Sequence, residues 1–148
     1  MTTIKQATGQ EVASIIEKYP HTKNVMCTGA DGITLVTIEN EEITAFLSAF
    51  YREIPAPLDG ETECFINVIE IIDTQSRGKG IGSLLVQEAI KTATEKGATQ
   101  VRAYCEIQNK SSHMLWHKNG FGISPIKHHD GSIYGSFVTY RIPHTCRH

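Results

Sequence analysis

The run Arg77–Ser83 is the part of this chain whose composition points most directly to chemistry. Its three glycines, Gly78, Gly80 and Gly82, lie between an apolar strand and an amphipathic helix. The first amides of a helix have no partner inside the helix, and the helix dipole places partial positive charge there. Glycine lets the backbone approach a ligand closely because it has no Cβ. The run therefore predicts a site for a phosphorylated cofactor.

The spacing of these glycines excludes two common phosphate-binding motifs. No window matches the P-loop pattern GxxxxGK[ST], and the dinucleotide pattern GxGxxG also fails. After Gly78 and Gly80 the third position is Ser83. A glycine-rich turn can also form for steric reasons alone, so this run needs support from a second motif.

A second segment, residues 109–121, follows the predicted strand at residues 100–105 and supplies that support. The two segments together resemble the Gcn5-related N-acetyltransferase (GNAT) superfamily. The family pattern R/Q-x-x-G-x-G/A is matched by Arg77, Gly80 and Gly82. The pattern N-x-x-A-x-x-L-Y-x-K-x-G-F is matched by Asn109, Leu115, Lys118, Gly120 and Phe121, with Ser112 at the small-residue position. The close resemblance covers about residues 62–125, which we expect to form the cofactor-binding core.

The length and composition of the chain limit the number of domains and the kinds of partner that we expect. With 148 residues, the chain is expected to form one N-acetyltransferase domain over residues 1–148, with a short tail at about residues 143–148. A net charge of −2 gives no reason to expect a nucleic-acid partner. We expect no membrane partner, because no apolar run is long enough to span a bilayer. The four cysteines, which form no CxxC pair, indicate a reducing, cytoplasmic setting.

Helix and strand signals place both motifs on regular elements. A capping box at Thr8 and Glu11 predicts a helix that ends before Pro20. Strands are predicted at residues 33–39, 42–53, 64–72, 100–105, 123–128 and 133–142, and further helices at residues 81–96 and 111–119. The resemblance requires the order β-α-β-β-β-α-β-α-β-β. It implies an α/β, GNAT-like fold: a twisted mixed sheet flanked by helices, with splayed strands forming an acetyl-CoA cleft.

The resemblance also implies how acetyl-CoA, the co-substrate, would be held. Its pyrophosphate would sit on the amides of residues 78–83, and Arg77 and Lys79 would add positive charge. Its pantetheine would run beside the strand near Glu70, with Asn109 on the far wall. The implied contacts are Ile71, Ile72, Arg77, Gly78, Lys79, Gly80, Ile81, Gly82, Ser83, Asn109, Ser112 and Lys118.

Glu70 is our candidate for the general base. Acetyl transfer to an amine needs a group that takes the proton of an ammonium whose pKa is about 10. Glu70 is the only carboxylate within the apolar run Cys64–Ile72, where a charge is costly unless it faces a wet cleft or a partner. The alternative is that it lies on a solvated patch or pairs with Arg102 or a lysine. Weaker candidates for the base are Glu61, Glu63 and Glu106.

Trp116 is the clearest departure from the family pattern, which has a tyrosine that can protonate the departing thiolate. An indole N–H can donate a hydrogen bond but cannot transfer its proton at a useful pKa. Trp116 could wall the thioester channel while solvent protonates the thiolate, which is the reading we favour. Alternatively, His113 could replace the tyrosine as acid, or the protein could bind CoA and catalyse poorly.

The function expected from these residues is acetyl-CoA-dependent N-acetyl transfer to a primary amine of a small molecule or peptide, by direct attack in a ternary complex. The alternatives are a non-catalytic acyl-CoA-binding or regulatory module, or an acyltransferase with a different donor or acceptor. Seven histidines are present, but their spacing predicts no metal site. The final hairpin offers a plausible edge for a homodimer.

Overall fold

The structure is a computed structural model that describes residues 2–27 and 29–143. Most of the predicted tail, including Cys146, lies outside the described residues. The elements are β1 (Thr3–Gln6), α1 (Gly9–Lys18), η1 (Pro20–Thr22), β2 (Gly32–Glu39), β3 (Glu42–Glu53), β4 (Thr62–Ile71), η2 (Thr74–Ser76), α2 (Ile81–Glu95), β5 (Gln100–Glu106), α3 (Lys110–Lys118), β6 (Gly122–Lys127) and β7 (Ile133–Arg141). This order confirms the predicted one and adds two short 3₁₀ turns.

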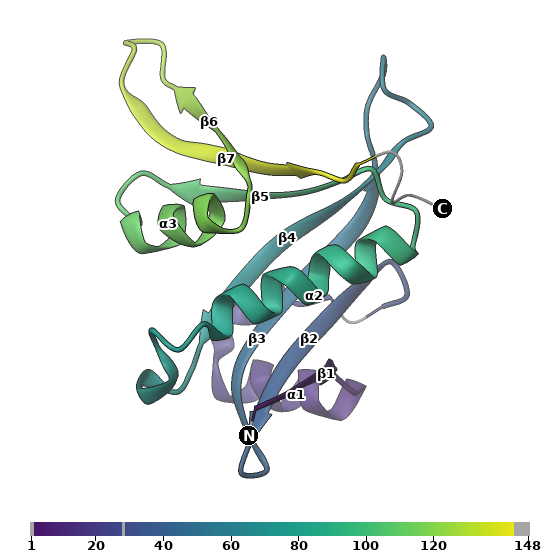
Figure 1. The fold of residues 1–148 in the computed structure, drawn as a ribbon, viewed down its shortest axis with the longest axis vertical. Coiled ribbons are helices and arrows are strands. Elements are labelled where there is room, and N and C mark those ends of the chain that lie inside the picture. The colour runs from purple at the N-terminus through teal and green to yellow at the C-terminus, as the bar shows by residue number, and fades with distance from the viewer. Residues whose placement is uncertain (1, 28, 144–148) are drawn as a thin grey trace.

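A seven-stranded mixed sheet forms the centre of the fold, in the order β1-β2-β3-β4-β5-β7-β6. Neighbouring strands are antiparallel except β4 and β5, which run parallel. Helix α2 crosses one face of the sheet and α1 lies against the other (Figure 1). The predicted mixed α/β sheet with helices on both faces is confirmed.

Local sequence signals explain the two helices that cover the sheet. At the start of α1, Thr8 accepts a hydrogen bond from the Glu11 amide and the Glu11 side chain accepts one from the Thr8 amide, so the predicted capping box is present. Helix α2 buries Ile81, Leu85 and Ala89 against the sheet. A smaller cluster packs Val12 and Ile15 of α1 against the other face.

A β-bulge in β4 determines which face each of its later side chains occupies. Ile66 pairs with Ala49 of β3 and Val68 with Ser48, so Asn67 is the extra residue. Before the bulge, Ile66 faces α2; after it, Ile69 does. Glu70 therefore lies on the opposite face, where α1 packs. In a regular strand it would share a face with Ile66, four residues earlier.

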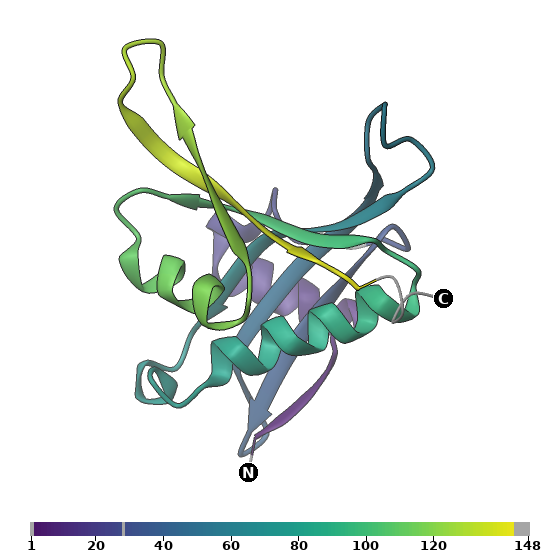
Figure 2. The ribbon, with the colours of Figure 1, turned by 45° about the horizontal axis from the view of Figure 1, so that its top comes forward.

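Strands β4 and β5 separate halfway along their length. Their register runs from Glu63–Gln100 to Ile66–Ala103 and stops there. Beyond this point β4 stays paired with β3 as far as Ile71, and β5 stays paired with β7 as far as Glu106. The sheet thus opens between its two halves, and α3 lies on the β5 side of the opening (Figures 1 and 2).

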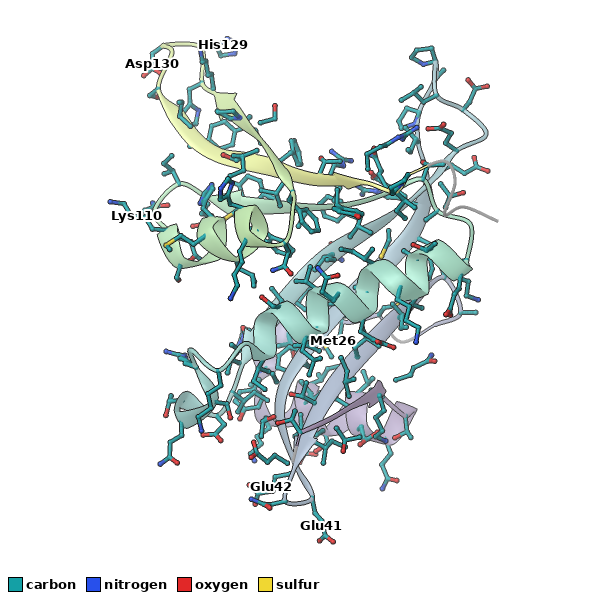
Figure 3. The ribbon with its side chains drawn as sticks, viewed as in Figure 1. Met26, Glu41, Glu42, Lys110, His129 and Asp130 are labelled. Atoms are coloured by element: carbon teal, nitrogen blue, oxygen red, sulfur yellow. The ribbon has the colours of Figure 1, made fainter. Side chains whose placement is uncertain are left out.

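Two hairpin turns lie away from this opening. Glu41 lies in the β2–β3 turn, next to Glu42 at the start of β3, and His129 and Asp130 lie at the tip of the β6–β7 hairpin (Figure 3). Within residues 2–27 and 29–143, no helix is long and apolar enough to cross a membrane.

Candidate active site

A cleft of about 1240 Å³ lies where β4 and β5 part. Its walls come from the end of β4, the turn and first residues of α2, α3, and one residue of β6. The lining residues are Ile69, Glu70, Ile71, Arg77, Gly78, Gly80, Ile81, Gly82, Ser83, Asn109, Ser111, Ser112, His113, Met114, Leu115, His117, Lys118 and Ile123. The lining thus joins the two sequence motifs to the end of the central strand.

The glycine turn presents unpaired backbone amides to this cleft. Gly78 and Gly80 both have φ +80°, and a Cβ on either would meet nothing within 4 Å, so open space faces the backbone at both positions. The first bond of α2 is donated by the Leu84 amide to the Gly80 carbonyl, 3.0 Å away. The amides of residues 81–83 consequently have no partner inside the helix and are available to an anion.

Gly82 allows α2 and α3 to approach closely. A Cβ at this position would lie 3.3 Å from a methyl carbon of Leu115. Asn119 ties the same helices together: its amide donates to Ser83 Oγ at 3.0 Å and its oxygen accepts from Gln87 at 2.9 Å. The two walls of the cleft are therefore joined by both packing and hydrogen bonds.

Asn109 and His113 shape the α3 side of the cleft. Asn109 caps α3, its Oδ1 accepting a bond from the Ser112 amide at 3.0 Å. His113 Nδ1 lies 3.0 Å from the Asn109 carbonyl oxygen and 3.2 Å from the Cys105 Sγ atom. His113 Nε2 lies 3.3 Å from Ser136 Oγ. Both ring nitrogens are thus already partnered.

The structure brings most of the predicted site residues to one place. The residues that line the cleft as expected are Glu70, Ile71, Arg77, Gly78, Gly80, Ile81, Gly82, Ser83, Asn109, Ser112, His113 and Lys118. Their roles toward acetyl-CoA and toward the acceptor stay predictions.

Three predicted residues do not line the cleft. The Ile72 amide donates to the Thr44 carbonyl at 2.8 Å, and its side chain packs on the α1 side. Lys79 is exposed and is not among the residues that line the cleft. Trp116 is 2% exposed and packs against Phe121, with ring centroids 4.9 Å apart. Our expectation that Trp116 walls the channel is therefore corrected: its side chain belongs to the core.

Other lining residues were not predicted from the sequence as site residues, although Leu115 is part of the second motif. They are Ile69, Ser111, Met114, Leu115, His117 and Ile123. Met114 is 71% exposed, which is unusual for a large apolar side chain and follows from its position at the open cleft. Helical spacing from Asn109 could have indicated some of these residues, but no local signal marks Ile123.

Glu70 stands half-exposed at the cleft and pairs with a histidine from a distant segment. Its Oε1 lies 2.7 Å from His21 Nε2, and its side chain is 36% exposed. His21 belongs to η1 and is 49 residues away in sequence. The alternative that Glu70 pairs with Arg102 does not hold, because Arg102 binds a different acid.

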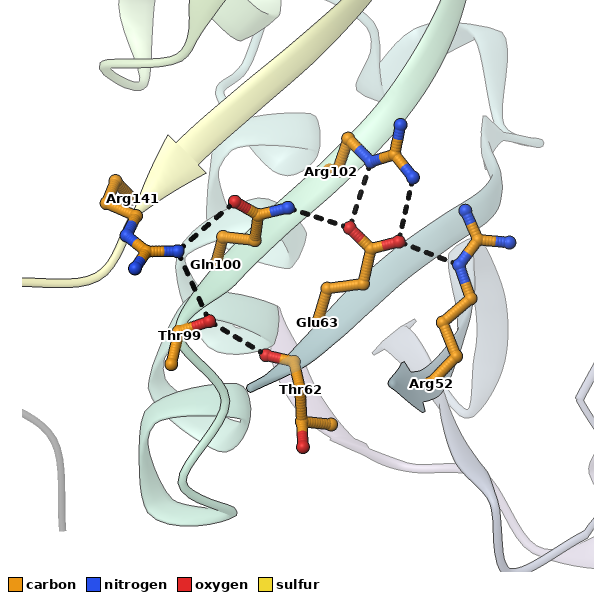
Figure 4. Close-up of polar contacts among 7 residues, drawn as sticks. All are labelled: Arg52, Thr62, Glu63, Thr99, Gln100, Arg102 and Arg141. Carbon is orange, nitrogen blue, oxygen red and sulfur yellow. Dashed lines mark hydrogen bonds and ion pairs between the residues drawn. The ribbon is translucent and has the colours of Figure 1, made fainter. Parts of the chain in front are cut away.

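That other acid is Glu63, which was a weaker candidate for the base. Its carboxylate accepts bonds from Arg102 Nη2 at 2.8 Å, Arg52 Nε at 2.7 Å and Gln100 Nε2 at 2.8 Å (Figure 4). Burial raises the pKa of Glu63, but these hydrogen bonds outweigh it and lower the pKa to about 2. Glu63 is thus a fully bonded structural carboxylate.

The remaining candidates are also accounted for by their surroundings. Glu61 pairs with Arg141 at 3.0 Å, and Glu106 lies exposed at the end of β5. Cys27, Cys64 and Cys105 are buried free thiols. Over the described part of the chain, no three His, Cys, Asp or Glu side chains gather as a metal ion would require.

Comparisons with known proteins agree with this geometry. Residues 7–121 match the sequence profile of the Acetyltransferase (GNAT) family. The Bacillus subtilis (strain 168) protein "Putative phosphinothricin acetyltransferase YwnH" is 34% identical over an alignment of 102 residues that covers 65% of this chain. The matched part spans 59% of that relative's length.

Solved structures share the fold at low sequence identity. The yncA protein of Salmonella typhimurium, solved with its cofactor acetyl-CoA, has a TM-score of 0.73 and 20% identity, covering 97% of this chain and 95% of its own. Arabidopsis thaliana NAA60, bound to a bisubstrate analogue, has a TM-score of 0.74 and 12% identity, covering 96% and 98%. With its glycine turn, its parted strands and a family match across most of its length, this chain belongs to the GNAT acetyltransferase family.

Proposed function

We propose that this protein transfers the acetyl group of acetyl-CoA to a primary amine by direct attack in a ternary complex. The observation that carries the proposal is the single cleft in which free amides of the glycine turn and the Glu70 carboxylate meet. The first feature suits a pyrophosphate and the second suits a proton released from an amine.

The turn and α3 would hold the co-substrate. The amides of residues 81–83 and the backbone at Gly78 and Gly80 would bind the pyrophosphate, with Arg77 adding positive charge. The pantetheine would lie between the free edge of β4 and Asn109, because β4 has no strand partner on that side after Ile66. A β4 amide near Ile71 would also polarise the thioester carbonyl. The Ile72 amide is already engaged and is left out of this assignment.

Glu70 would accept the proton of the attacking amine. The bulge at Asn67 turns Glu70 to the α1 face of the sheet, while Ile69 and Ile71 face α2. The acceptor amine would accordingly approach from the α1 face and meet the thioester in the opening between β4 and β5. The new C–N bond forms as the C–S bond breaks, with the amine proton passing to the carboxylate.

Solvent would protonate the CoA thiolate. A thiolate whose pKa is about 8.5 is a stable leaving group and does not need a dedicated acid. Trp116 is buried away from the cleft, and both ring nitrogens of His113 are bonded to neighbours. His113 would contact the leaving group without being required to protonate it.

The acceptor is proposed to be a small amine, with phosphinothricin as the first compound to test because of the relative's name. The experiment measures thiol release from acetyl-CoA with phosphinothricin, amino acids, a polyamine and an aminoglycoside. Direct attack predicts intersecting double-reciprocal lines when acetyl-CoA and the amine are varied. Parallel lines would contradict a ternary complex, and CoA binding without thiol release for any amine would favour a binding module.

A further inference from the structure

We propose that His21 is a positioning residue that fixes the Glu70 carboxylate for proton uptake. The proposal rests on the proposed function, because it assigns a role to His21 only if Glu70 is the base. Its basis is the 2.7 Å contact between His21 Nε2 and Glu70 Oε1 at the edge of the cleft. The contact joins the α1–β2 segment to β4, two parts of the chain that share no sequence motif.

The segment that carries His21 is held firmly. Pro20 begins the η1 turn, and the Thr22 amide donates to the Tyr19 carbonyl at 2.9 Å. Thr22 is completely buried, and its hydroxyl donates to the same carbonyl at 2.7 Å. The Tyr19 ring meets the imidazole edge-on, with centroids 6.4 Å apart. The imidazole is therefore presented to Glu70 by a bonded turn and not by a free loop.

The pairing leaves half of the carboxylate available. A protonated Nε2 donates to Oε1, and among the described residues nothing forms a hydrogen bond to Oε2. Oε2 can then face the incoming amine while Oε1 is fixed. A carboxylate on β4 has several rotamers, and holding one of them reduces the cost of reaching the geometry for proton transfer.

A purely structural role explains the contact less well. The His21 side chain is 60% exposed and that of Glu70 is 36% exposed, and polar side-chain pairs with this much exposure add little stability. The remaining consequence of the contact is local: it sets the direction of one carboxylate at the cleft. Removing it should therefore change turnover while leaving unfolding almost unchanged.

The test compares kcat for acetyl transfer in the wild-type protein and in His21→Ala, His21→Gln and His129→Ala. The acceptor is the amine, among phosphinothricin and the other compounds tested above, that the wild-type protein acetylates fastest. His21→Ala should lower kcat about tenfold with the KM for acetyl-CoA unchanged. His21→Gln keeps an N–H donor and should recover most of the loss. His129 is exposed at the β6–β7 tip, so its variant should match the wild type.

A second comparison separates this proposal from the proposed function. In a Glu70→Gln background, His21→Ala should cause no further loss, because the group it orients is gone. An equal loss in both backgrounds, or His21→Ala behaving like His129→Ala, would overturn the positioning role while Glu70 kept its own. Full turnover by Glu70→Gln, or no turnover with any amine, would overturn both proposals.

Discussion

Glu63 and Glu70 lie on the same strand and the same face of the sheet, yet they occupy opposite environments. Glu63 stands where β4 and β5 are paired, is 1% exposed, and is bonded by Arg52, Arg102 and Gln100. Glu70 stands beyond the point where these strands part, is half-exposed, and has His21 as its one described partner. The strand thus carries one carboxylate that holds the sheet together and one that faces the cleft.

The difference follows from the strand pairing rather than from the residue type. Where β5 lies beside β4, Arg102 neutralises the buried acid and Gln100 donates a hydrogen bond to it. Where β5 has turned away, no neighbouring strand can do so, and the acid is left for a ligand. Parting of the two strands therefore leaves Glu70 exposed at the cleft, whereas Glu63 is bonded within the sheet.

Glu63→Gln should give the largest change in stability. Removing the charge leaves the partly exposed guanidinium groups of Arg52 and Arg102 facing a neutral amide at a buried position, which costs about 2 kcal/mol of unfolding free energy. Urea denaturation at pH 7 measures it. Glu61→Gln is the control, because its pair with Arg141 is partly exposed and should cost less than about 1 kcal/mol. Equal losses of unfolding free energy in the two variants would contradict a special structural role for Glu63.

The difference in unfolding free energy between the wild type and Glu63→Gln should disappear at acidic pH. The pKa of Glu63 falls from 4.5 to about 2 on folding, so its contribution is fully present above pH 4.5 and is lost as the pH falls toward 2. The gap in unfolding free energy between the wild type and Glu63→Gln should therefore narrow over this window. A gap that stays constant down to pH 2 would show that the carboxylate charge is not its source.

Gly80→Ala tests the cofactor side of the cleft. The left-handed backbone strains an alanine by about 1–2 kcal/mol, and its methyl group enters the space where the phosphates would approach. We expect the Kd for acetyl-CoA to rise about tenfold. Gly131→Ala is a matched control, with φ +89° and open space at the β6–β7 hairpin. Gly131→Ala should lose similar stability and bind acetyl-CoA with wild-type affinity. Weaker acetyl-CoA binding in both variants would indicate a general effect of backbone strain.

His113→Gln should give the smallest effect. With solvent protonating the thiolate, kcat should fall less than about fivefold, measured at saturating acetyl-CoA and amine. His117→Gln, also in the cleft lining, is the control for local disturbance. A fall of about a hundredfold for His113→Gln alone would instead identify His113 as an essential acid.

Much of the fold and of the cofactor site could be predicted from local patterns. The Thr8 capping box, the glycine turn and the β2–β3 strand pair each depend on neighbouring residues, and the structure agrees with all three. The residues of the two motifs meet because the turn and α3 follow adjacent strands.

The remainder depends on contacts that no local pattern records. The direction of Glu70 is set by the bulge at Asn67, and an unbulged strand would turn it toward α2. His21 reaches Glu70 across 49 residues. Trp116 and Leu115 are adjacent apolar residues about 100° apart around a helix. Packing places Leu115 at the cleft and Trp116 in the core, whereas we expected Trp116 to wall the channel.

The most direct test of the account is to titrate Glu70→Gln with acetyl-CoA and then measure thiol release with the amine that the wild type acetylates fastest. We expect wild-type affinity for acetyl-CoA, because the phosphate turn is untouched, and a kcat lowered about a hundredfold. Unchanged turnover would show that the proton leaves by another route. Loss of acetyl-CoA affinity would show that Glu70 serves the cofactor rather than the amine.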